Sequence, residues 1–439
     1  MKVLKFGGTS VGSAQRMKDV AKLITDGEQK IVVLSAMSGT TNTLVEISDY
    51  LYKKNPEGAN EVINKLEAKY KQHIEELYST EEYKQKTSEF VKSVFDYIRS
   101  FTKDLFTLFE EKVILAQGEI ISTNMVTNYL CEQGVKAVLL PALEFMRTDK
   151  NSEPDLTYIR EKLAVQLEEH PGQEIYITQG FICRNAYGEI DNLQRGGSDY
   201  TASLIGAAVN ASEIQIWTDI DGMHDNDPRI VDQTSPVRQL HFEEAAELAY
   251  FGAKILHPTC VQPAKYANIP VRLLNTMEPA APGTLISNDT EKGKIKAVAA
   301  KDNITAIKIK SSRMLLAHGF LRKVFEIFES YQTAIDMVCT SEVGVSMSID
   351  NTKHLNEIID DLKKYGTVTV DHDMCIVCVV GDLEWENVGF EAKALDAMRD
   401  IPVRMISFGG SNYNISFLIR ESDKKKALQS LSDVLFNHK

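Results

Sequence analysis

The sequence predicts an α/β protein in which a mainly parallel sheet, sandwiched by helices, is followed by two βαββαβ units. Up to residue 290, short apolar runs rich in β-branched residues alternate with helix-period segments. Two loops that join such a strand to a helix contain adjacent glycines, Gly7-Gly8 and Gly196-Gly197. Beyond residue 290, one order of strands and helices occurs twice. Continuous apolar strands are typical of parallel sheets buried on both faces, and a repeated pattern indicates repeated domains.

Composition limits the classes of function. The chain has 439 residues, enough for two or three domains, and is 43% hydrophobic and 25% charged, as expected of a soluble globular protein. Its formal net charge of -13 argues against nucleic acid or an anionic membrane as main partners, because both require a basic surface. No apolar run approaches the length of a membrane span, and the N-terminus lacks a signal-peptide pattern.

The six cysteines are scattered and lie mostly in apolar surroundings. The one C-x-x-C, Cys375 to Cys378, lies in a strand-like run with no second pair nearby, which favours two packed thiols over a zinc site. We therefore expect a reducing, cytoplasmic protein and no protein-bound metal cluster.

The first strand–loop–helix unit is residues 1–27. The stretch Lys5-Phe6-Gly7-Gly8-Thr9-Ser10 follows a short apolar run and precedes a helix-period segment at residues 17–24. Paired glycines remove every Cβ where a ligand would approach the backbone, and amides at a helix start favour a phosphate. Thr9 and Ser10 are expected to cap that helix, and Lys5 could place a charge beside the phosphate. Gly7 and Gly12 have P-loop spacing, but Ser13 stands where that motif needs its lysine, so this turn taken alone is better explained as a plain chain reversal.

The next elements repeat this arrangement. Residues 31–36 form a buried strand that leads through the small-residue loop 35–42 into a helix pattern. Residues 57–112 predict long amphipathic helices, best explained as a solvated hairpin packed on the sheet. Residues 113–131 predict another helix, in which Gly118 permits a close approach and Glu119, taken alone, would be a surface carboxylate. In such sheets, ligands gather at the carboxyl ends of the strands.

A second glycine pair follows the strands predicted at residues 137–140 and 175–181. It lies in Arg195-Gly196-Gly197-Ser198-Asp199, ahead of a helix rich in small residues, which Ser198 or Asp199 could cap. A further strand at residues 214–219 runs into an acidic loop that lacks the EF-hand spacing. Residues 251–258 end a helix, residues 269–274 form a strand, and residues 278–294 mark a domain boundary.

The last part of the chain is a weak internal repeat. The first copy is strand 304–309, a helix from Gly319 to residue 331, strands 334–338 and 343–349 joined by a turn at 340–342, and helix 354–365. The second is strand 375–380, helix 389–398, strands 403–407 and 413–419, and helix 423–436. Each copy would stack two helices on a four-stranded antiparallel sheet. Residues 295–300 read as one more strand, which could complete the second copy's sheet instead.

Together these motifs resemble aspartate kinase (aspartokinase) over essentially the whole chain. The markers are Lys5-Phe6-Gly7-Gly8-Thr9-Ser10, Gly180-Phe181-Ile182, Arg195-Gly196-Gly197-Ser198-Asp199, Trp217-Thr218-Asp219, Asp227-Pro228-Arg229 and Phe251-Gly252-Ala253-Lys254. Within the family the chain is similar to the monofunctional lysine-sensitive type. The resemblance implies an amino-acid-kinase domain at residues 1–290 and ACT, ferredoxin-like domains at 291–371 and 372–439.

The resemblance implies phosphorylation of the L-aspartate side chain by ATP to 4-phospho-L-aspartate, the first step of lysine, threonine and methionine biosynthesis. Lys5 would contact the transferring phosphate and Asp199 would hold Lys5 or the phosphate loop. The aspartate pocket would comprise Ser35, Ala36, Thr41, Glu119, Phe181, Arg195 and Ser198. The nucleotide site would comprise Lys5, Gly7, Gly8, Thr9, Thr218, Asp219, His224, Arg229 and Lys254. Mg²⁺ would be held largely by ATP phosphates and water.

For regulation, the resemblance implies an amino-acid effector site. Its residues would be Met314, Gly319, Leu321, Asp336, Thr340, Ser341 and Glu342. Asp336 and Glu342 could bind the two ammonium groups of lysine, although threonine, or both together, stays open. Dimerisation or tetramerisation through the ACT domains is expected, because such sheets leave edges to pair.

Some positions depart from the family pattern, and two other functions stay open. Gln194 and Cys183 replace glycines, His224 replaces a frequent tyrosine in the nucleotide loop, and Ala317 replaces a serine near the effector site. The alternatives are a sibling kinase acting on acetylglutamate, glutamate or a nucleotide monophosphate, and a non-catalytic amino-acid sensor. The first does not explain the paired repeat, and retention of the charged site residues argues against the second.

Overall fold

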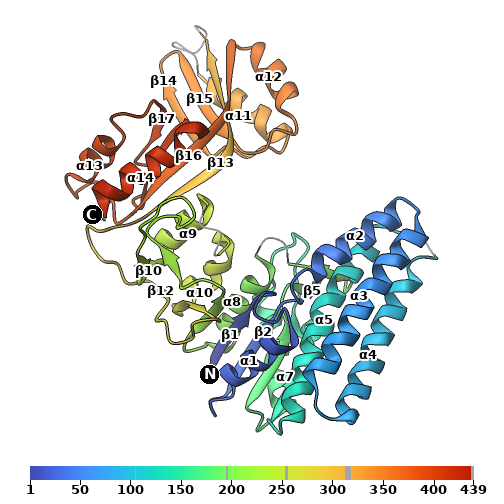
Figure 1. Cartoon of the computed structure of the whole chain (residues 1–439). Helices are drawn as coiled ribbons and strands as arrows, with labels where there is room; N and C mark the ends of the chain where they lie inside the picture. The colour runs from blue at the N-terminus through green and yellow to red at the C-terminus, as the bar shows by residue number, and fades with distance from the viewer. Residues whose placement is uncertain (104, 194–195, 253–255, 312–317, 437–439) are drawn as a thin grey trace. The chain divides into compact units, whose positions relative to one another are not determined.

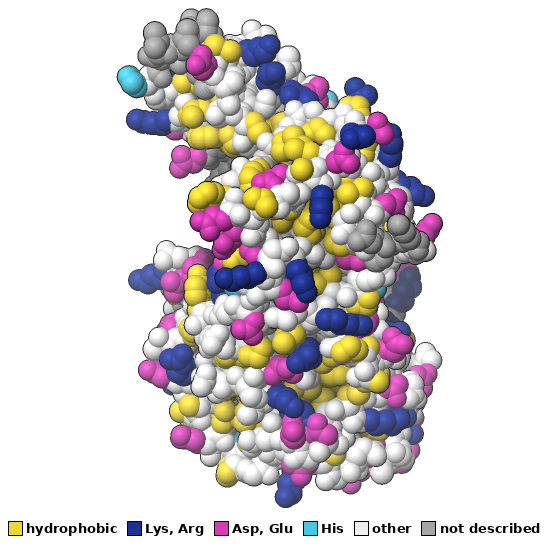
Figure 2. Space-filling model, turned by 90° about the vertical axis from the view of Figure 1, so that its left-hand side faces the viewer, with side chains coloured by type: hydrophobic (Ala, Val, Ile, Leu, Met, Phe, Trp, Pro, Cys, Tyr) yellow, Lys and Arg dark blue, Asp and Glu magenta, His cyan; other side chains and the backbone are white. Residues whose placement is uncertain are grey.

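The computed structural model of the protein describes residues 1–103, 105–193, 196–252, 256–311 and 318–436. It divides into two compact units, residues 1–223 with 255–288, and residues 224–254 with 289–439. Each unit is described by itself. None of the described helices combines the length and the apolar character that a membrane span requires. On the face shown in Figure 2, basic side chains are interspersed with acidic ones.

The first unit is built on a mainly parallel sheet, in the strand order β12-β11-β7-β1-β2-β4-β3. The strands are β1 (Lys2–Phe6), β2 (Lys30–Leu34), β3 (Ala137–Leu139), β4 (Ile175–Gln179), β7 (Ile214–Thr218), β11 (Val271–Asn275) and β12 (Thr284–Ser287). All of these neighbours pair in parallel except β11 with β12. Because β1, β2, β4 and β7 run in one direction, the loops that follow them meet at one edge of the sheet.

Helices pack around this sheet (Figure 1). They are α1 (Ala14–Ile24), α2 (Thr40–Tyr52), α3 (Pro56–Leu77), α4 (Glu81–Ser100), α5 (Leu108–Glu132), α6 (Ala142–Phe145), α7 (Leu156–Glu169), α8 (Gly197–Val209), the short 3₁₀ helix η1 (Pro258–Val261) and α10 (Gln262–Tyr266). A small hairpin of β5 (Ile182–Arg184) and β6 (Ile190–Asn192) completes the unit. The predicted helical hairpin is α3 and α4, which pack on each other and on α2 and α5 with their apolar faces buried.

Two predicted helix caps were wrong. Helix α1 starts at Ala14, and its cap is Ser13, whose hydroxyl accepts a hydrogen bond from the Arg16 amide at 3.3 Å. Thr9 and Ser10 lie in the preceding turns, and the Ser10 hydroxyl is 2.8 Å from that of Thr276. The glycine-rich loop is therefore longer than a single turn, and Thr9 lies with Gly8 at the wall of a cavity.

Helix α8 also begins differently from the prediction. Its cap residue is Gly196, in the left-handed conformation with φ 77°, and no side chain caps the helix. Ser198 and Asp199 lie in the first turn, where a carboxylate stabilises the helix start through the helix dipole. Their side chains are consequently available for other contacts.

The second unit carries the repeat. Its elements are β8 (Met223–His224, at the unit boundary), β9 (Pro236–Val237), β10 (Gln239–His241), α9 (Phe242–Tyr250), β13 (Ile295–Lys310), α11 (Phe320–Ser330), β14 (Met337–Ser341), β15 (Gly344–Ile349), α12 (Leu355–Lys363), β16 (Thr367–Gly381), α13 (Phe390–Ala397), β17 (Val403–Ser407), β18 (Asn414–Arg420), η3 (Glu421–Asp423) and α14 (Lys424–Leu435). Six strands form one antiparallel sheet in the order β14-β15-β13-β16-β18-β17.

The two copies share their longest strands. Residues 305–310 of β13 pair with β15, and residues 304–310 pair with residues 367–374 of β16. Residues 295–301 pair instead with residues 376–381 of β16. Residues 295–300 thus lie beside the strands of the second copy. Each copy obtains four strands, but one of them is the extension of the other copy's first strand. The pairing of the two long strands is irregular between these halves, where each strand contains a residue with positive φ, Asn303 at 59° and Asp373 at 54°.

The hairpin of the first copy is shifted relative to the prediction. Strand β14 covers Met337–Ser341, so Thr340 and Ser341 are strand residues and only 342–343 form the turn. Its pairing with β15, from Met337 opposite Ser348 to Ser341 opposite Gly344, fixes this register. Cys375 and Cys378 are buried free thiols, as predicted.

Candidate active site

A cavity of about 450 Å³ lies at the carboxyl edge of the parallel sheet, where the sequence predicted a ligand. It is lined by Gly8, Thr9, Ser35, Ala36, Met37, Ser38, Gly39, Thr41, Asn42, Glu119, Phe181, Gly197 and Ser198. The structure therefore brings together predicted residues from five separate segments of the sequence. It adds Met37, Ser38, Gly39 and Asn42, which belong to the small-residue loop 35–42 and were not singled out individually.

Lys5 and Asp199 form an ion pair beside this cavity. The Lys5 ammonium lies 2.7 Å from Asp199 Oδ1, and only 11% and 15% of the two side chains are exposed. Lys5 comes from the end of β1 and Asp199 from the first turn of α8. A Cβ placed on Gly7 would lie 3.3 Å from the Lys5 Nζ, so the ammonium reaches the underside of the glycine loop. The pair holds a cation in place where an anion could approach.

The two loops after β1 and β2 are interlocked through their backbones. The Ser38 amide donates to the Gly8 carbonyl at 3.1 Å. A Cβ on Gly8 would stand 2.8 Å from the Ala36 carbonyl oxygen, a distance that real Cβ atoms essentially never show. Glycine is required at position 8 because the loops touch there.

Glu119 is a buried carboxylate at the wall of the cavity. Its Oε1 accepts a hydrogen bond from the Ala36 amide at 3.1 Å, whereas its Oε2 has no hydrogen-bond partner within the described structure. Burial raises the pKa of Glu119 to about 7, only partly offset by the Ala36 hydrogen bond. The helix can bring Glu119 this close because Gly118 has no side chain: a Cβ there would lie 2.8 Å from the Ala36 Cβ. The predicted close approach at Gly118 is confirmed.

Phe181 occupies a strained turn at the cavity. Its φ is 69°, which is rare for a bulky residue, and the Ile182 amide closes the turn on the Gly180 carbonyl at 2.8 Å. The Phe181 amide donates to the Thr201 hydroxyl at 3.0 Å, which holds the turn against α8. A Cβ on Gly197 would lie 2.5 Å from the Phe181 ring. The strain therefore serves to place an aromatic wall against the start of α8.

Ser35 and Ser198 join the second strand to α8 across the cavity. The Ser35 hydroxyl donates to the Ser198 hydroxyl at 2.9 Å, and the Ser35 carbonyl accepts a hydrogen bond from Ser122 at 2.8 Å. A Cβ on Gly180 would lie 2.4 Å from the Ser198 hydroxyl oxygen, so this glycine also permits the contact.

The remaining predicted nucleotide residues are spread over both units. Thr218 ends β7 and its hydroxyl caps the Ile220 amide at 3.2 Å, while the adjacent Asp219 is exposed. In the second unit, the His224 Nδ1 lies 2.9 Å from the Thr234 hydroxyl, and Arg229 folds onto Asp227 at 2.7 Å. Arg195 and Lys254 lie outside the described residues.

The predicted effector residues belong to the second unit. Gly319 starts α11 with φ 83°, and Thr340, Ser341 and Glu342 are exposed at the tip of the β14–β15 hairpin. Leu321 is 37% exposed, and Met314 lies outside the described residues.

Asp336 differs from the other effector residues because it is already paired. Its carboxylate lies 2.7 Å from the Lys301 ammonium and accepts a hydrogen bond from the Tyr250 hydroxyl at 2.7 Å. Its side chain is only 2% exposed, and its Oδ2 has no hydrogen-bond partner within the described structure. Sequence reasoning missed Lys301 and Tyr250, since both are distant from Asp336 along the chain.

Comparison with known proteins identifies the family. The amino acid kinase family model matches residues 1–275, and an ACT domain model matches residues 377–435. Aspartokinase 1, chloroplastic, of Arabidopsis thaliana is 35% identical over 99% of this chain and 80% of its own length. The chain belongs to the aspartokinase family. The lysine-sensitive aspartokinase 3 of Escherichia coli is 31% identical over 99% of each chain.

Solved aspartokinase structures share the fold. E. coli aspartokinase III in complex with aspartate and ADP superposes with a TM-score of 0.85 at 31% identity, covering 99% of this chain and 100% of that one. The aspartate kinase of Clostridium acetobutylicum gives a TM-score of 0.85 at 26% identity and the same coverage. The predicted family, the fold class of a mainly parallel sheet with ACT domains, and the kinase activity are confirmed.

Proposed function

We propose that the cavity beside Lys5 is where this aspartokinase phosphorylates the side-chain carboxylate of L-aspartate with ATP, which yields 4-phospho-L-aspartate and ADP. The observation that supports this placement is the Lys5–Asp199 ion pair, held at 2.7 Å beside a cavity of about 450 Å³. The E. coli relative is named in complex with aspartate and ADP.

Phosphoryl transfer to a carboxylate needs charge compensation and no general base. An aspartate side chain, with an ordinary pKa near 3.9, is already ionised at neutral pH. The difficulty is that one anion must attack another, which positioned cations and backbone dipoles relieve. Lys5 supplies the cation, and Asp199 keeps its ammonium in place until the phosphate approaches.

Glu119 receives the ammonium group of the substrate in this proposal. Its Oε2 has no hydrogen-bond partner among the residues that the structure describes, and its Oε1 is fixed by the Ala36 amide. A cation bound there stabilises the ionised carboxylate and so lowers its pKa from about 7. Arg195 would bind a substrate carboxylate, and Ser35, Ala36, Thr41, Phe181 and Ser198 would complete the pocket.

ATP fits the loop after β1 because Gly7 places no side chain between the backbone and the Lys5 ammonium beneath it, and Gly8 lines the cavity. Thr9 would complete the cradle, while Thr218, Asp219, His224, Arg229 and Lys254 would contact the rest of the nucleotide. Mg²⁺ would accompany ATP and would be held by its phosphates and by water, where it neutralises charge on the transferring group.

Lysine is the effector we favour, because the E. coli relative is named as lysine-sensitive. Asp336 and Glu342 supply carboxylates for its two ammonium groups, with Met314, Gly319, Leu321, Thr340 and Ser341 around them. The Lys301 ammonium on Asp336 occupies the position that an effector ammonium would need. Effector binding would therefore displace Lys301 or share the free Oδ2 of Asp336 with it.

The larger organisation is also part of the proposal. We assign catalysis to residues 1–290 and regulation to the ACT domains 291–371 and 372–439, and we expect a cytoplasmic homodimer or homotetramer assembled through the ACT domains. Sedimentation equilibrium of the full chain measures the oligomer size.

The acceptor identifies the reaction. Purified protein with ATP and Mg²⁺ should release ADP when L-aspartate is added, and not when acetylglutamate, glutamate or a nucleotide monophosphate replaces it. ADP release with another acceptor, or with none, would contradict the proposed pocket.

A further inference from the structure

The two ACT copies can be superposed position by position through their strand pairing. Thr305 lies opposite Ile349 in the first copy, and Cys375 lies opposite Ile419 in the second. Cys375 lies 70 positions after Thr305, and Ile419 lies 70 positions after Ile349. The positive-φ residues of the two long strands have the same offset. Positions in and next to these four strands, β13, β15, β16 and β18, therefore correspond by the same count.

At three corresponding positions the two copies carry opposite charges. In the first copy the positions are Lys301, Asp336 and Asp350. Their counterparts in the second copy are Asp371, Arg404 and Arg420. Asp336 and Arg404 differ by 68 positions, and the strand of Arg404 has an irregularity between Val403 and Met405. They correspond because each directly precedes a methionine whose strand partner, at position 348 or 418, again differs by 70, and because each pairs with the equivalent residue, Lys301 or Asp371. One cation with two carboxylates is thus replaced by one carboxylate with two cations.

In the first copy the cluster is closed. The Lys301 ammonium lies 2.7 Å from Asp336 and 2.9 Å from Asp350. Tyr250 of α9 donates to Asp336 at 2.7 Å, and the Lys301 ammonium lies 4.4 Å from the centre of its ring. The aromatic side chain thus occupies the space above the ions.

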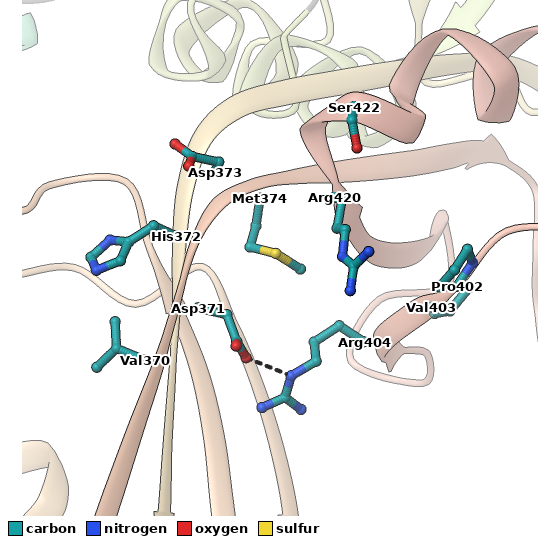
Figure 3. A pocket seen from close by; sticks show the side chains of 10 residues that line it. All are labelled: Val370, Asp371, His372, Asp373, Met374, Pro402, Val403, Arg404, Arg420 and Ser422. Carbon is teal, nitrogen blue, oxygen red and sulfur yellow. Dashed lines mark hydrogen bonds and ion pairs between the residues drawn. The ribbon is translucent and has the colours of Figure 1, made fainter.

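In the second copy the matching cluster faces a cavity of about 580 Å³ (Figure 3). Asp371 pairs with the Arg404 Nε at 2.8 Å, whereas Arg420 has no ion pair with any residue that the structure describes. Figure 3 shows the Arg420 guanidinium and the Met374 side chain directed toward the space between them, the Arg404 guanidinium turned toward Asp371, and the Asp373 carboxylate directed away from the arginines. The Arg420 guanidinium therefore lines the cavity without an ion-pair partner among the described residues.

We propose that this cavity binds a small organic anion through a carboxylate or phosphate group held by Arg420 and Arg404. The planar guanidinium fork matches both groups, and its hydrogen bonds to an anion are among the stronger ones in proteins. The volume lies within the range of small-molecule sites. Met374, Pro402 and Val403 supply an apolar wall for the carbon skeleton of the ligand. This site lies in the second copy and takes a ligand of the opposite charge to an effector ammonium, so it is separate from the proposed lysine site.

Met374 gives a local signal for the test. The full chain, labelled with ¹³C at its methionine methyl groups, is titrated with succinate and, separately, with inorganic phosphate at constant ionic strength. The Met374 resonance is assigned with Met374→Leu. We expect it to shift saturably with at least one probe, and the better probe shows whether carboxylate or phosphate is the preferred group. Arg420→Ala should weaken that binding by on the order of 10-fold or more.

Arg399→Ala is the matched control, because this arginine lies in the same copy outside the cavity and is 70% exposed. It should leave the titration unchanged. The proposal is overturned if neither probe moves the Met374 resonance, if Arg420→Ala binds as well as the wild type, or if Arg399→Ala weakens binding equally. Because Arg420 is exposed, its variant should fold, and an unchanged thermal midpoint and kinase rate verify this.

Discussion

The ammonium of Lys5 lies 2.7 Å from the carboxylate of Asp199, although the two residues come from distant parts of the chain. Strand β1 supplies the lysine, and the first turn of α8, after the second glycine pair, supplies the aspartate. The ion pair therefore connects the two glycine loops, and in the proposed reaction it orients the cation that faces the transferring phosphate. A largely shielded pair of this kind is fixed in direction, which is what electrostatic stabilisation of a transition state needs.

Lys5→Ala should lower kcat by on the order of 10²–10³, the range for loss of one preorganised stabilising group. The reason is that the transferring phosphoryl group loses its positioned cation. Steady-state kinetics with L-aspartate and ATP measure the effect. Lys2→Ala is the control, because Lys2 lies in the same strand with a partly exposed side chain paired to Glu28. A kcat for Lys5→Ala within a few-fold of wild type would show that Lys5 is only a strand residue.

Aspartate binding should depend on pH through Glu119. Burial raises the pKa of Glu119 to about 7, so the carboxylate becomes ionised only as the pH rises through that value. The KM for aspartate should therefore rise by about tenfold between pH 8 and pH 6, as the ionised fraction falls. Glu119→Gln should raise the KM at pH 8 and abolish this pH dependence. A profile in Glu119→Gln that matches the wild type would remove Glu119 from the ammonium site.

The same group should affect stability in the absence of ligands. Because the folded pKa of Glu119 lies above its ordinary value of 4.5, its protonated form stabilises the fold, and this contribution is lost as the pH rises through about 7. When Glu119 is fully ionised, the free energy of unfolding is lower by about 3 kcal/mol at most. Glu119→Gln should accordingly raise the Tm relative to wild type at pH 8 and have little effect at pH 5. The exposed Glu161→Gln is the control, and an identical response of both variants would contradict the assignment.

Gly8→Ala should impair catalysis by pushing two loops apart. The added Cβ would lie 2.8 Å from the Ala36 carbonyl oxygen, so the backbone must shift at the cavity. We expect a loss of kcat of at least about 10-fold, because catalytic geometry tolerates little displacement. Gly410→Ala serves as the control, since its added methyl would meet no atom within 4 Å. Normal turnover in Gly8→Ala would show that the loops adapt freely.

Glu342→Ala should relieve inhibition by lysine while leaving the uninhibited rate near that of wild type. Glu342 is exposed at the β14–β15 turn, so its truncation costs little stability, but the effector loses a carboxylate for one of its ammonium groups. Inhibition curves with lysine, and separately with threonine, measure the change. Glu329→Ala, an exposed glutamate on α11, should behave as the wild type. An unchanged inhibition curve for Glu342→Ala would refute the effector assignment.

The local pattern predicted the parallel sheet and the two glycine loops beside the cavity, because buried strands and glycine pairs can be recognised directly in the sequence. The helix caps at Thr9, Ser10, Ser198 and Asp199 could not be predicted, since several polar residues compete for one cap and tertiary contacts decide among them. The Asp199 carboxylate forms an ion pair with Lys5, and the Ser10 hydroxyl forms a hydrogen bond with that of Thr276, so both side chains contact residues distant in sequence. The sharing of β13 and β16 between the two copies likewise depends on long-range pairing.

The residues found only in the structure likewise depend on contacts between distant parts of the sequence. Lys301 and Tyr250 meet Asp336 across 35 and 86 positions of sequence. The structure also shows that Glu119 Oε2 is buried without a hydrogen-bond partner among the described residues. The sequence could not predict this, because a single glutamate in a helix pattern does not differ from a surface glutamate. The resemblance to the family suggested roles for Glu119 and Asp336, and the structure identified the residues that contact them.

Formation of an acyl phosphate on aspartate is the most direct test of the central claim. Purified protein is incubated with ATP, Mg²⁺ and hydroxylamine, which traps 4-phospho-L-aspartate as a hydroxamate, with and without L-aspartate. We predict hydroxamate only when L-aspartate is present, at a rate that Lys5→Ala reduces on the order of 10²–10³-fold. Absence of an aspartate-dependent hydroxamate from the wild type, or an undiminished rate in Lys5→Ala, would contradict the account.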